Sequence, residues 1–220
     1  MSVTTELLLV RHGEAHCNVS GRVGGEGTCT GLTEHGRGQV SRLAHRLRRE
    51  HATTPINALY TSPRRRTLET ASLLSEELGL EPHVMPALRG LDHGEADGRP
   101  WSTIKTRFGG RPQRYPNKAI APGAESWNTY LDRCRATLQR ILEAHIGERV
   151  LIAAHGETIE ASFTLFYRLA LDGQEHPGQV TSHACLTRWQ YHRNRFDHGV
   201  WMLAGHNDTR HLEPQGEEGR

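Results

Sequence analysis

Lysine is almost absent from this sequence: Lys105 and Lys118 are the only two, and arginine supplies the other 25 of the 27 basic residues. Arginine suits bidentate contacts to phosphate. For most of these residues, however, a codon-usage bias is the simpler explanation. With histidines neutral the formal net charge is only +2, which does not predict a nucleic-acid partner. The aromatic residues show no stacking pattern for single strands either, so we expect no nucleic-acid binding.

Cysteine is also scarce, and the four residues are scattered along the chain: Cys17, Cys29, Cys134 and Cys185. Their number and spacing exclude a disulfide scaffold, and no Cys-x-x-Cys pair indicates a zinc ribbon or a thioredoxin-type redox site. Long hydrophobic runs are missing too, since the apolar run at residues 7–10 ends at Arg11. A run this short is neither a signal-peptide core nor a membrane span. We therefore expect a cytoplasmic protein with no membrane partner.

Strand and helix signals alternate along the chain. Short apolar runs predict buried strands at residues 6–11, 56–60 and 149–154. Helical spacing predicts helices after the cap Thr33, from Ser62-Pro63 to Gly79, over residues 125–146 and over about 157–170. Two more strands, at residues 184–191 and 200–204, are expected to be antiparallel around a polar turn. This order predicts the α/β class, as a three-layer α/β/α sandwich with a mostly parallel central sheet.

One segment, residues 88–123, breaks the alternation and is expected to be an irregular cap insertion. It is rich in Gly, Pro and Arg, and its seven basic against three acidic side chains give it a net charge of +4. Long irregular insertions in a compact domain are usually functional or disordered. We interpret it as a basic cap over an anionic substrate; the alternative is a solvated excursion whose charges face water. Without a repeat or a linker, we expect one domain over residues 1–212 and a polar tail at 213–220.

Two of the predicted strands end in the same dipeptide, His-Gly. The first runs into Arg11-His12-Gly13, and the third runs into His155-Gly156. Ligands of open α/β sheets bind beyond the carboxyl ends of the strands. A single Arg-His-Gly is more simply a buried, hydrogen-bonded histidine, but two histidines delivered to one crevice indicate a site. A neutral imidazole there can attack phosphorus while an arginine holds the phosphoryl oxygens.

Three arginines at a predicted helix start break a local rule. Arg64, Arg65 and Arg66 follow Ser62-Pro63, where the free N–H groups of a helix favour anions and not cations. This placement is unfavourable unless an anion lies among the arginines, which indicates a phosphate site. For any one of them, an orientation into solvent is the alternative.

Together these segments resemble the histidine phosphatase superfamily, in its phosphoglycerate-mutase-like branch. The matching motifs run in order through nearly the whole chain: residues 11–18, 31–39, 61–71, 123–126, 155–156 and 207–212. Each motif is weak alone, but the set is highly specific. The resemblance implies a metal-independent phosphatase that hydrolyses a small phosphorylated metabolite through a phosphohistidine and needs no cofactor.

The resemblance also implies a role for each matching residue. His12 is the phosphorylated nucleophile, and His155 is its catalytic partner. The residues implied to bind phosphate are Arg11, Asn18, Arg66 and Gly156. The register of the motif selects Arg66, not Arg64 or Arg65, as the arginine that points inward.

One position departs from the family pattern. Gly90 stands where relatives carry the glutamate that protonates the leaving group, and a general acid contributes about 10²–10⁴-fold. We expect Asp92, the nearest carboxylate in sequence, to replace it. Glu157 is the alternative acid, and the third option is that no dedicated acid exists. A replacement acid should be partly desolvated, since burial raises a carboxyl pKa towards neutrality.

The same residues allow other functions. The chain could be a phosphomutase, or a non-hydrolytic member that binds a phosphorylated ligand without turnover, or it could use the phosphoenzyme in a biosynthetic reaction. His12 and His16 are four residues apart, but the H-E-x-x-H pattern is absent, so we expect no metal. The oligomeric state is open, and a homodimer is one option.

Overall fold

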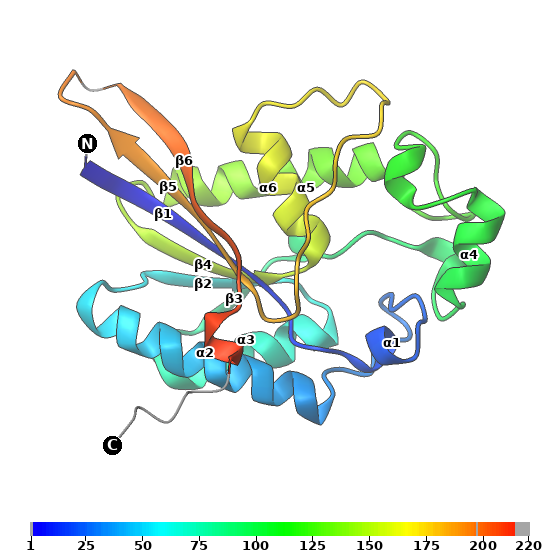
Figure 1. Cartoon of the computed structure of the whole chain (residues 1–220), viewed down its shortest axis with the longest axis horizontal. Helices are drawn as coiled ribbons and strands as arrows, with labels where there is room; N and C mark the ends of the chain where they lie inside the picture. Colours follow the sequence, from blue (N-terminus) through cyan, green and yellow to red (C-terminus); the bar gives the residue numbers. More distant parts are fainter. Residues whose placement is uncertain (1, 197, 214–220) are drawn as a thin grey trace.

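A computed structural model describes residues 2–196 and 198–213 of the chain. In this part, six strands form one sheet in the order β3-β2-β4-β1-β5-β6 (Figure 1). The strands are β1 (Ser2–Arg11), β2 (Ala58–Thr61), β3 (Pro82–Val84), β4 (Arg149–Ala154), β5 (Leu186–Arg193) and β6 (Gly199–Asp208). The first four in that order run parallel, and β5 and β6 add an antiparallel edge. The prediction of a mostly parallel α/β sheet is therefore confirmed.

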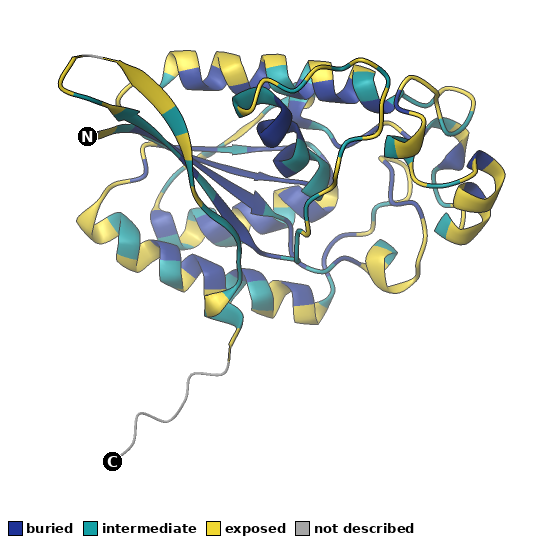
Figure 2. Cartoon of the chain, turned by 45° about the horizontal axis from the view of Figure 1, so that its top comes forward, coloured by how far each residue is buried: buried dark blue, intermediate teal, exposed yellow. Residues whose placement is uncertain are grey.

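Helices cover both faces of the sheet, as the alternation of strands and helices predicts. They are α1 (His16–Val19), α2 (Glu34–Thr53), α3 (Arg65–Leu78), α4 (Trp101–Phe108), α5 (Trp127–Ala144) and α6 (Gly156–Phe166). Successive side chains of β1 point to opposite faces: Leu7 and Leu9 pack into the core under α5 and α6, and Leu8 and Val10 into the core under α2 and α3. Figure 2 shows the buried strands enclosed between these two layers.

Several helix boundaries follow from local capping chemistry. Thr33 caps α2 by accepting a hydrogen bond from the backbone N–H of Gly36 at 2.9 Å, and Gly79 ends α3 in the left-handed conformation (φ 65°). The prediction that Ser62 caps α3 is wrong, because the helix begins at Arg65 with Arg64 at its N-cap. The hydroxyl of Ser62 instead contacts Nε2 of His155 at 2.8 Å.

Other boundaries shift by a few residues. Helix α6 ends before the predicted residue 170, at Phe166, and Arg168 then takes a positive φ of 53°. Strand β6 extends to Asp208, beyond the predicted residue 204. The three-residue edge strand β3 has no apolar run of its own, so the sequence pattern does not predict it.

The cap insertion contains more regular structure than the sequence pattern predicts. It forms α4 and two short 3₁₀ turns, at Gly94–Ala96 and Pro112–Arg114, and Ile104 and Ala96 pack with Val23 in a small core of their own. Its basic side chains are exposed except for the half-buried Arg89: Arg99, Lys105, Arg107, Arg111, Arg114 and Lys118. These side chains are exposed, in agreement with the solvated alternative, and the role of the insertion as a basic cap stays a prediction. Of the predicted polar tail, residues 214–220 lie outside the described part of the chain.

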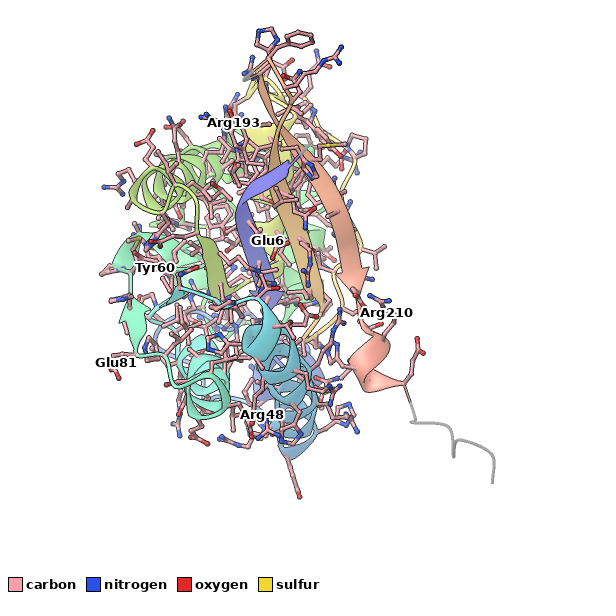
Figure 3. The ribbon with its side chains drawn as sticks, turned by 90° about the vertical axis from the view of Figure 1, so that its left-hand side faces the viewer. Glu6, Arg48, Tyr60, Glu81, Arg193 and Arg210 are labelled. Atoms are coloured by element: carbon pink, nitrogen blue, oxygen red, sulfur yellow. The ribbon has the colours of Figure 1, made fainter. Side chains whose placement is uncertain are left out.

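An ion-pair network lies near the start of β4, at the end of the parallel strands away from His12 and His155. Glu6 on β1 is 4% exposed, and its carboxylate pairs with Arg149 at 2.5 Å and with Arg188 at 3.3 Å. Figure 3 shows Glu6 at this end of the sheet. Its charge is satisfied by these partners, so Glu6 has a structural role. Among the described residues, no helix combines the length and the hydropathy that crossing a membrane requires.

Candidate active site

The two His-Gly segments lie side by side because their strands are neighbours. Strands β1 and β4 pair in parallel with Arg11 opposite Ala154, so the next residues, His12 and His155, leave the sheet together. Their ring centroids lie 5.6 Å apart, and both side chains are buried, at 3% and 0% exposure. Figure 1 shows α1 and α4 near this end of the parallel strands.

His12 is held as a neutral imidazole with a defined tautomer. Its Nδ1 lies 2.7 Å from the carbonyl oxygen of Gly13, and its Nε2 lies 2.9 Å from Nε of Arg66. Because a guanidinium only donates, Nε2 accepts, and the ring proton sits on Nδ1. Burial, followed by the charges of Arg66 and Arg11, holds the pKa of His12 well below 6.5. The lone pair of Nε2 therefore remains available at neutral pH.

His155 has the opposite tautomer by the same reasoning. Nη2 of Arg66 donates to its Nδ1 at 3.3 Å, so the proton lies on Nε2, which faces the hydroxyl of Ser62. Burial, then the charges of Arg66 and Arg64, keeps the pKa of His155 well below its ordinary value. Arg66 thus binds both histidines.

Two arginines of the triplet point inward, not one. Arg64 is 3% exposed and donates to the carbonyl oxygens of Gly24 at 2.7 Å and Leu91 at 2.6 Å. Arg66 also reaches Gly24, at 2.8 Å. The prediction that Arg66 points inward is confirmed, but the prediction that Arg64 does not is wrong. Arg65 is exposed, as predicted, and pairs with Glu69 at 3.0 Å. Arg64 thus links Gly24 to the cap insertion at Leu91. These hydrogen bonds are made within the protein and do not require a ligand.

Arg11 is oriented by the segment that precedes β5. Its Nη1 donates to the carbonyl oxygen of Thr181, and its Nη2 lies 3.0 Å from Nε2 of His183. Burial and the charge of Arg11 lower the pKa of His183 to about 4, so this ring is neutral and accepts from Arg11. The sequence pattern does not single out His183, which carries no motif.

These side chains line an open cavity of about 220 Å³. Its lining includes six of the predicted site residues: Arg11, His12, Asn18, Arg66, Gly156 and Glu157. His155 lies beneath them, in contact with Arg66. A larger cavity of about 750 Å³, between α5 and the β5–β6 hairpin, contains none of these residues. The chemistry therefore belongs to the smaller cavity.

Asn18 and Gly156 shape the wall of this cavity. Oδ1 of Asn18 accepts the backbone N–H of Ala15 at 3.0 Å, which leaves the amide nitrogen as the donor for a ligand. A Cβ at position 156 would lie 2.7 Å from Oγ1 of Thr181, so only glycine fits here without a shift.

The two candidate acids are placed differently. Asp92 is exposed and lies outside the cavity lining, and its Oδ1 accepts the backbone N–H of Gly94 at 3.0 Å. Glu157, in the first turn of α6, lines the cavity. Burial acts to raise the pKa of Glu157, but its own backbone N–H and the charges of Arg11 and Arg66 outweigh this and lower it. Glu157 is therefore ionised at neutral pH.

Position 90 lies against the second histidine. A Cβ built on Gly90 would be 3.2 Å from Cδ2 of His155. Such a contact is tighter than ordinary packing allows, so a side chain at this position would push on the His155 ring. Glycine at position 90 therefore allows the His155 ring to pack closely against the backbone there.

Several further lining residues escaped the sequence analysis, among them His93, Gln113 and Glu160. Glu160 lies one helical turn after Glu157, and this i, i+3 spacing in a helix that follows His155 was the only available signal. Burial, reinforced by Glu157, raises the pKa of Glu160 to about 7. Among residues 2–196 and 198–213, no three His, Cys, Asp or Glu side chains converge as a metal site requires.

The chain is similar to known phosphatases and mutase-like proteins. The sequence profile of the histidine phosphatase superfamily (branch 1) matches residues 7–204. A metal-independent phosphoserine phosphatase of Arabidopsis thaliana is 32% identical over 98% of this chain and 86% of its own length. Phosphoglycerate mutase-like protein 4 of the same plant is 29% identical over 96% and 88%. The solved structure of a mycobacterial glucosyl-3-phosphoglycerate phosphatase is 25% identical and superposes with a TM-score of 0.76, covering 92% and 98% of the two chains.

Proposed function

The chain belongs to the histidine phosphatase superfamily (branch 1), and from this premise we propose that it is a metal-independent phosphatase of a small phosphorylated metabolite, acting through a phosphohistidine on His12. The observation that carries the proposal is the neutral His12, which lines the same cavity as Arg11 and Arg66 and whose unprotonated Nε2 accepts a hydrogen bond from Arg66. The names of the phosphatase relatives support hydrolysis as the reaction.

In the first step, Nε2 of His12 forms a bond to phosphorus and the ester oxygen leaves. Arg66 Nε exchanges its hydrogen bond from Nε2 to a phosphoryl oxygen, and Arg11 binds another. The guanidinium groups neutralise charge that the equatorial oxygens carry in the transition state. The Nδ1–H of His12 still donates to the carbonyl oxygen of Gly13, whose partial negative charge stabilises the positive charge that develops on the ring.

Glu157 is the better supported general acid. Asp92 is less well supported, because its side chain is exposed and lies outside the cavity lining. The backbone N–H of Glu157 and the positive charges of Arg11 and Arg66 keep Glu157 ionised in the free protein. A bound phosphate dianion neutralises these arginines and repels the carboxylate, so Glu157 takes up a proton when substrate binds. It then protonates the leaving oxygen, and afterwards, as a base, it activates the water that hydrolyses the phosphohistidine.

The test is phosphate release from a panel of phosphorylated metabolites and from p-nitrophenyl phosphate, an ester with a good leaving group. We expect wild type to release inorganic phosphate and His12→Ala to lose the activity, while His45→Ala, an exposed histidine on α2, remains active. A phosphohistidine trapped by rapid acid-free denaturation should map to His12. Equal rates for wild type and His12→Ala would refute the proposal.

Two alternatives separate in the same assay. A mutase would yield an isomeric phosphate in place of inorganic phosphate, and its support is the mutase-like relative. A protein that only binds a phosphorylated ligand would bind without any turnover. The neutral state of His12 favours turnover, since binding alone does not require an unprotonated imidazole nitrogen beside Arg66.

The cytoplasmic location and the homodimer stay predictions. All four cysteines are free thiols, which supports a reducing compartment. Fractionation of cells with an antibody to the chain and light scattering of the purified protein test the two predictions separately.

A further inference from the structure

Beyond the phosphate-binding residues, the cavity continues to a second wall built from three separate segments. Glu157 and Glu160 come from α6, Gln113 from the turn Pro112–Arg114, and His93 from the loop before α4. His12, Arg11 and Arg66 line the same cavity of about 220 Å³ as this wall, so the leaving group of an ester bound at His12 lies within reach of it. The hydrogen-bonding groups and charges of the wall therefore indicate which groups the leaving group carries.

This wall holds hydrogen-bond acceptors that lack donors. Nε2 of Gln113 donates to Oε2 of Glu160 at 3.1 Å, while the buried Oε1 of Gln113 has no partner in the described part of the chain. His93 is 5% exposed, and neither of its ring nitrogens is hydrogen-bonded to any described residue. Burial and the charge of Arg64 lower the pKa of His93 to about 4, so the ring is neutral and one nitrogen accepts. Buried acceptors without donors are rare in folded proteins.

The charge of the wall is negative. Burial and the neighbouring Glu157 raise the pKa of Glu160 to about 7, which means that its ionised form lacks a sufficient cationic partner. The other groups that face Glu160 are the Gln113 amide, the exposed Arg111 and the backbone N–H of Gln179. Of the cations on the lining, Arg22 is exposed at the rim and its Nη1 donates to Gly98 at 2.8 Å. A cation on the ligand would complete this environment.

Resting on the phosphatase activity proposed above, we propose that the leaving group carries a protonated amine that binds Glu160, with Gln113 and His93 accepting its remaining N–H groups. The cavity of about 220 Å³ must also hold the phosphate, so the amine sits on a short chain. The substrate class is a small amino-alcohol phosphate. A leaving group that bears a carboxylate would instead meet the carboxylate of Glu160.

Three esters of matched size test this assignment: 2-aminoethyl phosphate, 2-hydroxyethyl phosphate and phosphoglycolate. We expect wild type to show a kcat/KM at least tenfold higher for the amine than for the hydroxyl ester, and lowest for the carboxylate. Glu160→Gln should bring the ratio of amine to hydroxyl ester close to one. The control Glu81→Gln, an exposed carboxylate on the loop before β3 (Figure 3), should keep the wild-type ratio.

The pH dependence adds a readout that a purely structural Glu160 would not move. The preference for the amine should grow between pH 6 and 8, as Glu160 ionises, and Glu160→Gln should remove this growth. Titration of shared groups, such as the phosphate or His12, cancels in the ratio of the two esters. Equal kcat/KM for both esters in wild type would overturn the proposal, and so would an equal loss on both in Glu160→Gln.

Calorimetry separates this inference from the proposed function. The His12→Ala protein should bind 2-aminoethyl phosphate at least tenfold more tightly than 2-hydroxyethyl phosphate, and the double variant with Glu160→Gln should not discriminate. If wild type releases no phosphate from p-nitrophenyl phosphate, the phosphatase proposal fails, whereas the calorimetric preference still supports the amine subsite. Loss of that preference in His12→Ala, with phosphate release intact in wild type, would refute the subsite alone.

Discussion

Nε of Arg66 donates a hydrogen bond to Nε2 of His12 over 2.9 Å, so the arginine that is proposed to bind phosphate also holds the lone pair that attacks it. This contact keeps the imidazole in one tautomer and one orientation before substrate arrives. It is broken when phosphorus approaches, and the same N–H then binds a phosphoryl oxygen. Preorganisation of this kind avoids reorganising the site during the reaction.

Removal of this arginine should therefore impair chemistry more than folding. We expect Arg66→Ala to lower kcat/KM for p-nitrophenyl phosphate by about 10²–10³-fold, the range for loss of one preorganised donor. Arg65→Ala, which removes the exposed neighbour, should lose less than about twofold, because a surface ion pair contributes little. Comparable losses in the two variants would contradict the assignment of Arg66.

The choice between the two acids is tested by the leaving group. Glu157→Gln should slow an alkyl phosphate by about 10²–10⁴-fold and p-nitrophenyl phosphate far less, because nitrophenolate leaves without a proton. Asp92→Asn should change neither rate, since its carboxylate lies outside the cavity. A leaving-group effect in Asp92→Asn and none in Glu157→Gln would reverse the assignment.

Position 90 predicts an effect of a single methyl group. In Gly90→Ala, the new Cβ would lie 3.2 Å from the His155 ring, which must move by a few tenths of an ångström. We expect kcat on p-nitrophenyl phosphate to fall roughly tenfold, since small misplacements in an active site are costly. Gly38→Ala on α2, where the Cβ meets open space, is the control and should keep full activity. An unchanged kcat in Gly90→Ala would show that His155 tolerates the shift.

Acid should destabilise the fold through three buried or half-buried histidines. The pKa values of His93, His183 and His211 are about 4 in the folded chain, against 6.5 for an ordinary histidine. Below pH 6.5 the unfolded chain binds more protons, so the free energy of unfolding should fall from there down to about pH 4. Urea denaturation at pH 7, 6 and 5 measures this slope.

The matched variants for the acid slope are His183→Gln and His45→Gln. His183→Gln removes one of the three groups and should make the loss of stability between pH 7 and 5 shallower. His45 is on the surface of α2 and pairs with Glu77, so its replacement should leave the slope close to that of wild type. Parallel curves for wild type and His183→Gln would contradict the assigned pKa.

Much of the site could be predicted because it depends on local pattern and on strand register. An apolar run that ends in Arg-His or in His-Gly predicts a strand with chemistry at its carboxyl end, and parallel pairing of β1 with β4 brings His12 and His155 together. Thr33 and Gly79 marked helix ends for the same reason, since caps act within a few residues. Ser62 misled the prediction because its hydroxyl bonds to His155, far away in the sequence.

By itself the sequence determined the α/β sheet, the edge at which the histidines meet and the departure at Gly90, because periodicity and motif order are properties of the chain alone. Only the tertiary structure decided that Arg64 turns inward, that Asp92 faces water, and that Glu160 meets Gln113 across 47 positions. Side-chain direction in the cap and burial on α6 depend on which distant segments pack against each other. No short-range pattern encodes that packing, and the electrostatics of the leaving-group wall follow from it.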